Sequence, residues 1–148
     1  MTPALLFRRV AIAEATTWAL LLTGMFLKYV TETTELGVRV FGMLHGVVFV
    51  AYGVVTLVVA VDQRWRPGRT LVALACAVPP FATVPFDRWL ERRHPLADSW
   101  RLRATDPVGP LERVVAWLVR SPAQGVAAGL VAVVALTGLA LLVGPPTS

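Results

Sequence analysis

The sequence predicts an all-α membrane protein, a helical transmembrane bundle of three to four membrane-embedded helices plus a short interfacial amphipathic helix. Of its 148 residues, 56% are hydrophobic and only 16% are charged, against about 25% charged residues in soluble domains. Apolar segments of about 18 residues or more are typical of membrane spans. Residues 125–143 meet this criterion without a charged residue, and residues 40–61 meet it with His45 as the one exception.

The first apolar segment, residues 10–27, also reaches spanning length although it contains Glu14. Its basic start resembles a signal peptide, but Glu14 interrupts the hydrophobic region and no Ala-x-Ala-like cleavage site follows. The segment is therefore interpreted as a retained first span. Lys28 and Tyr29 at its end are a cation and an aromatic residue of the kind that lies at a membrane interface.

The weakest segment, residues 71–86, allows two topologies. It is 16 residues long and contains Pro79, Pro80 and Pro85. If it re-enters, twelve Lys and Arg residues lie on one side of the membrane and two on the other; if it crosses, the division is nine to five. The charge distribution favours re-entry, whereas proline is tolerated in spanning helices and crossing is the more common arrangement.

The chain divides into three parts by composition. Residues 1–92 hold the first three apolar segments, and residues 93–124 form an arginine-rich connection. Within that connection, residues 110–120 place Leu111, Val114, Val115 and Leu118 at helical spacing, which predicts a helix on the membrane surface. Residues 125–148 contribute an additional membrane helix and a short tail.

Ionisable side chains within apolar segments are the first candidates for a functional site, because they are costly in hydrocarbon. Glu14 could pair structurally with a loop arginine or act as a protonatable transport or ligand group. His45 and Tyr52 are seven residues apart and align within about 20° on a helix. His45 could be a hydrogen-bonded packing histidine or a proton-relay or ligand-binding group. Glu14 and His45 are expected in opposite halves of the membrane.

The partners of Asp87 and Arg88 depend on the topology of residues 71–86. If this segment crosses, a cluster of Lys28, His45 and Asp87 becomes feasible. If it re-enters, Glu14 and Arg88 become the natural pair. The candidate intramembrane polar set comprises Glu14, Lys28, His45, Tyr52, Asp87 and Arg88.

Two small-residue patterns predict close helix packing. They are Gly42-x-x-x-Gly46 and Gly125-x-x-x-Gly129, and such spacing lets helix backbones approach one another. The second pattern suits either packing within the chain or contact between copies of it.

Several function classes are not expected. The one cysteine, Cys76, allows neither a disulfide framework nor a thiolate metal site, and no cofactor or metal is predicted. The chain has no GxSxG, HExxH or phosphate-binding glycine loop, so we do not expect an enzyme. Its arginines flank apolar segments, as headgroup contacts do, and nucleic acid is not an expected partner. The expected partners are the lipid bilayer and either further copies of the chain or a larger membrane complex.

An ordered set of short motifs resembles the YdzA-like family of small bacterial integral membrane proteins, a domain-of-unknown-function family. The matching pieces are Arg9-Val10-Ala11 with Glu14, Leu27-Lys28-Tyr29, His45-Gly46-x-x-Phe49-x-x-Tyr52, and Pro85-Phe86 with Asp87 and Arg88. The resemblance covers about residues 5–92. It implies a shared polar set of Glu14, Lys28, His45, Tyr52 and Asp87, and a unit of three helices, which favours crossing by residues 71–86.

The resemblance implies no activity. Two functions therefore stand beside each other as expectations for a multi-pass protein of a bacterial cell membrane. One is a small ligand- or proton-linked transport or binding bundle that uses Glu14 and His45. The other is an accessory or structural subunit whose polar residues lock helix packing in a larger membrane complex.

Overall fold

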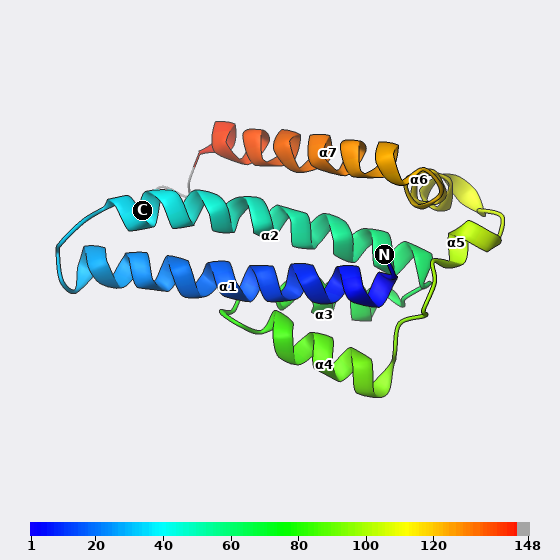
Figure 1. Ribbon diagram of the computed structural model, residues 1–148, viewed down its shortest axis with the longest axis horizontal. Coiled ribbons are helices and arrows are strands. Elements are labelled where there is room, and N and C mark those ends of the chain that lie inside the picture. Colours follow the sequence, from blue (N-terminus) through cyan, green and yellow to red (C-terminus); the bar gives the residue numbers. More distant parts are fainter. Residues whose placement is uncertain (145–148) are drawn as a thin grey trace.

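The computed structural model describes residues 1–144, and the secondary-structure elements within them are helices (Figure 1). Helices α1 (Pro3–Tyr29), α2 (Leu36–Asp62) and α7 (Pro122–Val143) are each long and apolar enough to cross a membrane. Helix α2 runs back along α1, and α7 lies along α2 on the other side from α1 (Figure 1). The predicted all-α membrane fold is confirmed. The predicted tail beyond Gly144 lies outside the described residues.

Helices α1 and α2 form the central pair. The Oγ1 atom of Thr2 accepts a hydrogen bond from the N–H of Leu5 at 3.1 Å, and Pro3 occupies the first turn, where its missing N–H is not needed. The two helices approach most closely near their connection, at Gly24 and Gly37. A methyl group added at Gly24 would lie 2.7 Å from the carbonyl carbon of Gly37.

Residues 71–86 form a helical hairpin instead of one continuous helix. Helix α3 (Pro67–Ala75) ends before a turn that contains Pro79 and Pro80, and α4 (Thr83–Arg93) returns along α1. The hairpin starts beside the end of α2 and finishes beside the start of α1 (Figure 1). Because both ends of the hairpin lie at the same end of the α1–α2 pair, its geometry is that of a re-entrant element and differs from the single crossing helix that the family resemblance favours.

The physical reason lies in the proline pair. Proline has no N–H and disrupts a helix interior. A turn placed at membrane depth must also leave few backbone donors without partners. Pro79 and Pro80 therefore break the helix where the lack of N–H groups costs least. The charge distribution favours the same arrangement, whereas the length of the segment alone does not.

The arginine-rich connection folds against the end of the bundle that holds the N-terminus. It contains the single turn α5 (Arg101–Ala104) and α6 (Gly109–Arg120). The predicted helix over residues 110–120 is confirmed, but its apolar residues lie on two faces of the helix, one exposed and one buried. Leu111, Val114 and Trp117 are exposed, whereas Val115, Ala116 and Val119 are buried with Trp100 and Leu102 in the core.

Helix α7 packs less deeply than the other long helices. None of its described residues is buried. The chain turns from α6 into α7 at Ser121, and a Cβ added at Gly125 in the first turn of α7 would collide with the carbonyl group of Leu118. The close approach predicted for Gly125 is therefore present, between consecutive helices. Atoms added at Gly46 or Gly129 would meet nothing within 4 Å, and the nearest neighbour at Gly42 would be a Leu21 methyl at 3.8 Å. Gly42 thus faces α1 at ordinary contact distance, and close packing at Gly46 and Gly129 stays a prediction.

Candidate functional site

Glu14 is buried completely and faces the hairpin. Its Oε2 atom lies 2.9 Å from the hydroxyl of Thr83, which is the first residue of α4 and is also 3.0 Å from the carbonyl oxygen of Ala11. The Oε1 atom of Glu14 has no hydrogen-bond partner among the described residues. The carboxyl group thus joins α1 to α4 through one oxygen and leaves the other inside the protein.

His45 contacts α1 at Thr17, three residues after Glu14. The Oγ1 atom of Thr17 donates to the backbone carbonyl of Glu14 at 2.9 Å and lies 2.9 Å from Nδ1 of His45. Because the hydroxyl has one proton, Nδ1 then acts as the donor to Thr17. Glu14 and His45, which were expected in opposite halves of the membrane, therefore lie at nearly the same level along the α1–α2 pair, since Thr17 contacts both residues.

Two aromatic side chains bind the backbone of the hairpin. The hydroxyl of Tyr52 donates to the carbonyl oxygen of Ala73 at 2.8 Å, and the indole N–H of Trp18 donates to that of Ala77 at 3.3 Å. The last carbonyls of a helix have no partner within it, and both acceptors lie where α3 ends. Tyr52 and Trp18 therefore satisfy backbone groups that the broken helix leaves free.

An ion-pair cluster holds the returning helix. Arg8 Nε lies 3.1 Å from Asp87 Oδ2, and a terminal nitrogen of Arg8 lies 2.8 Å from Glu91 Oε1. The Asp87 side chain is 11% exposed and that of Glu91 59% exposed. This cluster fixes the end of α4 beside the start of α1.

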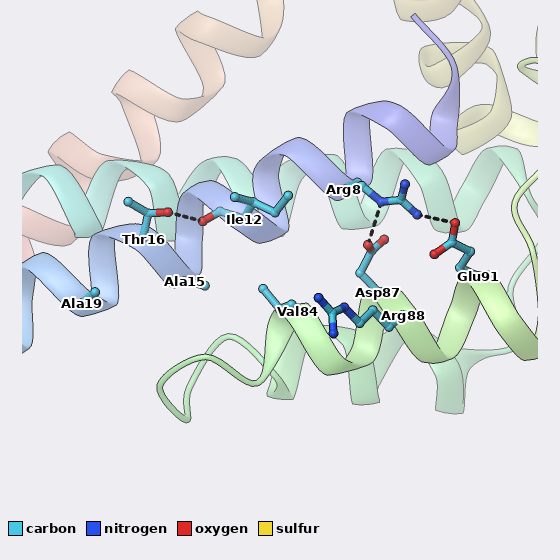
Figure 2. A pocket seen from close by; sticks show the side chains of 9 residues that line it. All are labelled: Arg8, Ile12, Ala15, Thr16, Ala19, Val84, Asp87, Arg88 and Glu91. Carbon is cyan, nitrogen blue, oxygen red and sulfur yellow. Dashed lines mark hydrogen bonds and ion pairs between the residues drawn. The ribbon is translucent and has the colours of Figure 1, made fainter.

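A groove runs along the α1–α4 contact next to this cluster (Figure 2). Its volume is about 680 Å³. Figure 2 shows charged groups toward one end and small or apolar side chains toward the other. It is lined by Arg8, Ile12, Ala15, Thr16, Ala19, Val84, Asp87, Arg88 and Glu91.

Neither of the predicted charge groupings forms. Lys28 lies at the far end of α1, 4.0 Å from Glu35, so it does not join His45 and Asp87. Asp87 pairs with Arg8, and Glu14 is bonded to Thr83. Arg88 is absent from the ion pairs of the described residues and points along the groove (Figure 2). Re-entry does bring Asp87 and Arg88 to the half of the bundle that holds Glu14, but Arg8 and Thr83 take the contacts.

A second polar cluster joins the connection to the end of α2. Asp62 is buried completely and accepts hydrogen bonds from the backbone N–H of Arg101 at 3.1 Å and of Leu102 at 2.9 Å. The Arg101 side chain donates to the carbonyl of Asp62 at 2.6 Å and lies 2.7 Å from Glu112 Oε1. Asp62 thus caps the N-terminus of α5, and the ion pair of Arg101 with Glu112 connects α5 to α6.

Glu112 also organises the start of α6. Its Oε2 atom accepts from the N–H of Val108, the residue before the helix, at 2.7 Å. This backbone hydrogen bond lowers the pKa of the Glu112 carboxyl, and the hydrogen bond from Arg101 lowers the pKa further. The carboxylate form is therefore the one that the fold uses.

Sequence reasoning missed five residues that make these contacts. For Trp18 the signal was chemical: a proline-broken apolar segment leaves backbone carbonyls free, so nearby apolar segments must supply donors. The indole N–H within residues 10–27 is such a donor. The missed residues are Arg8, Thr17, Trp18, Asp62 and Thr83.

No group of three or more His, Cys, Asp or Glu side chains within residues 1–144 is arranged to hold a metal ion. The contacts described around the hairpin are hydrogen bonds to backbone carbonyls, the Thr83–Glu14 contact and one ion-pair cluster. Such an arrangement can fix the position of a membrane-embedded hairpin, and the groove beside it can accept an amphipathic molecule.

The comparison with protein families matches residues 4–92 to a model described as "Domain of unknown function (DUF3817)". This range covers α1, α2, α3 and nearly all of α4, and so contains every contact around the hairpin. A Streptomyces coelicolor protein named as a putative membrane protein is 56% identical over 87 residues, which are 58% of this chain and 10% of that protein. The chain thus spans about a tenth of the length of the curated relative. No solved structure matches the chain. With more than half of its length matched, this multi-pass membrane protein belongs to the DUF3817 family of domains of unknown function.

Proposed function

We propose that the chain is a non-catalytic structural subunit of a larger assembly in the bacterial cell membrane, in which α1–α4 form a pre-locked helical unit. The observation that carries this proposal is the use of the polar side chains. Tyr52 and Trp18 bind carbonyls of the hairpin, and Thr83 and Arg8 join α4 to α1. These groups contact one another or the backbone, as residues that maintain a fold do.

The energetics agree with a locking role. In a bilayer, an unsatisfied backbone group costs several kcal/mol, whereas a side-chain hydrogen bond between membrane helices contributes about 1 kcal/mol. Four such contacts around one hairpin give it a defined position without any bound molecule. The same ordered polar residues carry the YdzA-like resemblance, and we propose that this resemblance reflects a shared locking set.

The size of the relative supports a role beside other components. The matched region of the Streptomyces coelicolor protein is a tenth of its length, so there this unit accompanies much more chain. Helix α7, which lies outside the family match, leaves every described residue at least partly exposed. We propose that α7 supplies the surface through which this chain meets a partner or another copy of itself.

A photo-crosslinking residue placed at Val131 on α7, which is 68% exposed, tests this assembly. In membranes, we expect one discrete adduct, and purification in mild detergent should recover the same partner at a constant ratio. A crosslinker at Ile12 on α1, which faces the groove, is the matched control. Adducts to lipid alone at Val131, together with recovery of the single chain, would contradict the proposal.

A second candidate function is a proton-linked transport or binding bundle. One observation favours it, namely that Glu14 Oε1 is buried and has no hydrogen-bond partner within residues 1–144. The Thr83 hydroxyl has one proton for two acceptors, so a hydrogen on Glu14 Oε2 would satisfy both contacts. The nearby Thr17–His45 contact extends this polar path across to α2.

The substitution Glu14→Gln separates the two functions. Glutamine retains an oxygen that accepts from Thr83 but cannot titrate. The structural proposal expects normal expression, normal assembly and a thermal unfolding temperature close to that of the unmodified protein. Loss of a pH-dependent ion flux in proteoliposomes, in a Glu14→Gln protein of unchanged stability, would instead support the transport function and contradict the structural one.

A further inference from the structure

The groove between α1 and α4 has the features of a lipid site that nothing in the locking role requires. Its volume of about 680 Å³ is in the range of sites for small ligands, roughly 300–1,000 Å³. One end is lined by Ala15, Ala19 and Val84, and the other by Arg8, Asp87 and Glu91 (Figure 2). It therefore changes from apolar to charged along its length, as a phospholipid does.

Arg88 marks the place of an anion in this groove. Its guanidinium has no carboxylate partner among the described residues, and it points back along α4 beside Val84 (Figure 2). An arginine stays charged, and toward the membrane interior that charge is costly without a counter-ion. A phosphate bound in a bidentate manner would supply one. Arg8, in contrast, is already shared between two carboxylates.

The carboxylates give the groove a second, opposite charge farther along. Glu91 lies nearly one helical turn beyond Arg88, toward the end of α4, and uses Oε1 for Arg8, which leaves Oε2 for another donor. Arg8, Asp87, Arg88 and Glu91 together carry no net charge. From the apolar end outward, the groove thus offers hydrocarbon contacts, then a cation, then an anion.

We propose that this groove binds one amine-bearing phospholipid of the phosphatidylethanolamine class. An acyl chain lies along Ala15 and Ala19, the phosphate contacts Arg88, and the ammonium group donates to Glu91. This order matches the order of acyl chain, phosphate and amine in the lipid. An anionic lipid without an amine, such as phosphatidylglycerol, would bring a net negative charge and only neutral hydroxyl donors to Asp87 and Glu91, and a quaternary ammonium cannot donate a hydrogen bond.

The test is native mass spectrometry of the purified full chain, titrated in mixed micelles with phosphatidylethanolamine, phosphatidylcholine or phosphatidylglycerol. We expect a single phosphatidylethanolamine to be retained at least about tenfold more strongly than either of the others, as for one lost charge-assisted contact. Arg88→Gln should remove retention of phosphatidylethanolamine, and Glu91→Gln should lower it to the level of phosphatidylcholine. Arg92→Gln, an exposed arginine on α4 outside the groove, should leave retention unchanged.

Each contrary result has a definite meaning. Equal retention of the three lipids, or an equal effect of Arg92→Gln, would overturn the site. Stronger retention of phosphatidylglycerol that depends on Arg88 but not on Glu91 would overturn the choice of an amine-bearing lipid. Thermal unfolding of each variant in the same detergent separates loss of binding from loss of fold, and Arg88→Lys, which keeps the charge without the planar fork, should retain intermediate binding.

Discussion

At the residue scale, this protein uses polar side chains in apolar helices to complete the backbone of a neighbouring element. Tyr52 is buried completely, and its phenol oxygen reaches the Ala73 carbonyl where α3 ends. Thr83 and Trp18 act in the same way from α4 and α1. The histidine and the carboxylate that stand out in the sequence are part of this set, and the neutral donors beside them make most of the contacts.

Removal of the Tyr52 hydroxyl tests this role. In Tyr52→Phe the ring still fits, but the Ala73 carbonyl loses its donor, and we expect a loss of about 1–2 kcal/mol in the free energy of unfolding. Unfolding by a denaturing detergent, followed by circular dichroism, measures it. Tyr29→Phe is the control, because Tyr29 is 63% exposed and makes no hydrogen bond through its hydroxyl within the described chain. Equal stability of the two variants would show that the Ala73 contact contributes nothing.

Glu112 gives the connection a pH dependence. Its pKa is lowered in the folded protein by the Val108 N–H and by Arg101. Its contribution to stability is therefore complete above the unfolded pKa, near 4.5, and is lost as the pH falls through the lower folded pKa. We expect Glu112→Gln to be less stable than the unmodified protein at pH 7, and the difference between them to shrink below pH 4.5.

Thermal unfolding at pH 7 and at pH 3.5 checks this dependence. The exposed Glu32, which makes no ion pair within residues 1–144, provides the matched substitution Glu32→Gln. A difference for Glu112→Gln that stays constant across this pH range would show that the carboxylate charge is not what α6 uses.

At the element scale, close approach between the long helices depends on a glycine pair near their connection. The motif Gly42-x-x-x-Gly46 suggested contact farther along α2, but space remains open beside Gly46. Gly24 lies on α1 and Gly37 on α2, so the two glycines form no spacing motif within one helix. Only the antiparallel pairing of α1 and α2 brings them together.

Two alanine substitutions distinguish these glycines. Gly24→Ala places a methyl group 2.7 Å from the Gly37 carbonyl carbon, so the helices must move apart, and we expect a loss of about 1–3 kcal/mol. Gly46→Ala meets no atom within 4 Å and should be neutral or stabilising by up to about 1 kcal/mol through helix propensity. Detergent-induced unfolding measures the difference in stability between the two variants. A greater loss of stability in Gly46→Ala than in Gly24→Ala would mean that Gly46 makes the closer contact.

At the scale of the whole molecule, the re-entrant hairpin sorts the charges. With its return, twelve of the fourteen Lys and Arg residues lie at the end of the bundle that holds the N-terminus, and Lys28 and Arg39 lie at the other. From the positive-inside rule we predict that the N-terminus, the hairpin ends and the connection lie on the cytoplasmic side. Helix α7 leads away from that side.

Cysteine accessibility tests this arrangement. In a Cys76→Ala background, Ser99→Cys in the connection should react with a membrane-impermeant thiol reagent only when the cytoplasmic face is exposed, as in inverted vesicles. Thr33→Cys in the α1–α2 turn should react only from the opposite face. Labelling of both positions from the same face would mean that residues 71–86 cross the membrane.

The sequence by itself determined the membrane class, the three spanning helices and the surface helix near residues 110–120, because length, hydropathy and helical periodicity are local properties. It also held the charge asymmetry that favours re-entry. Only the tertiary structure decided which groups meet. It joined Glu14 to Thr83, His45 to Thr17 and Arg8 to Asp87, because partners separated by up to 79 residues are chosen by how the hairpin packs. No spacing along one helix encodes that choice.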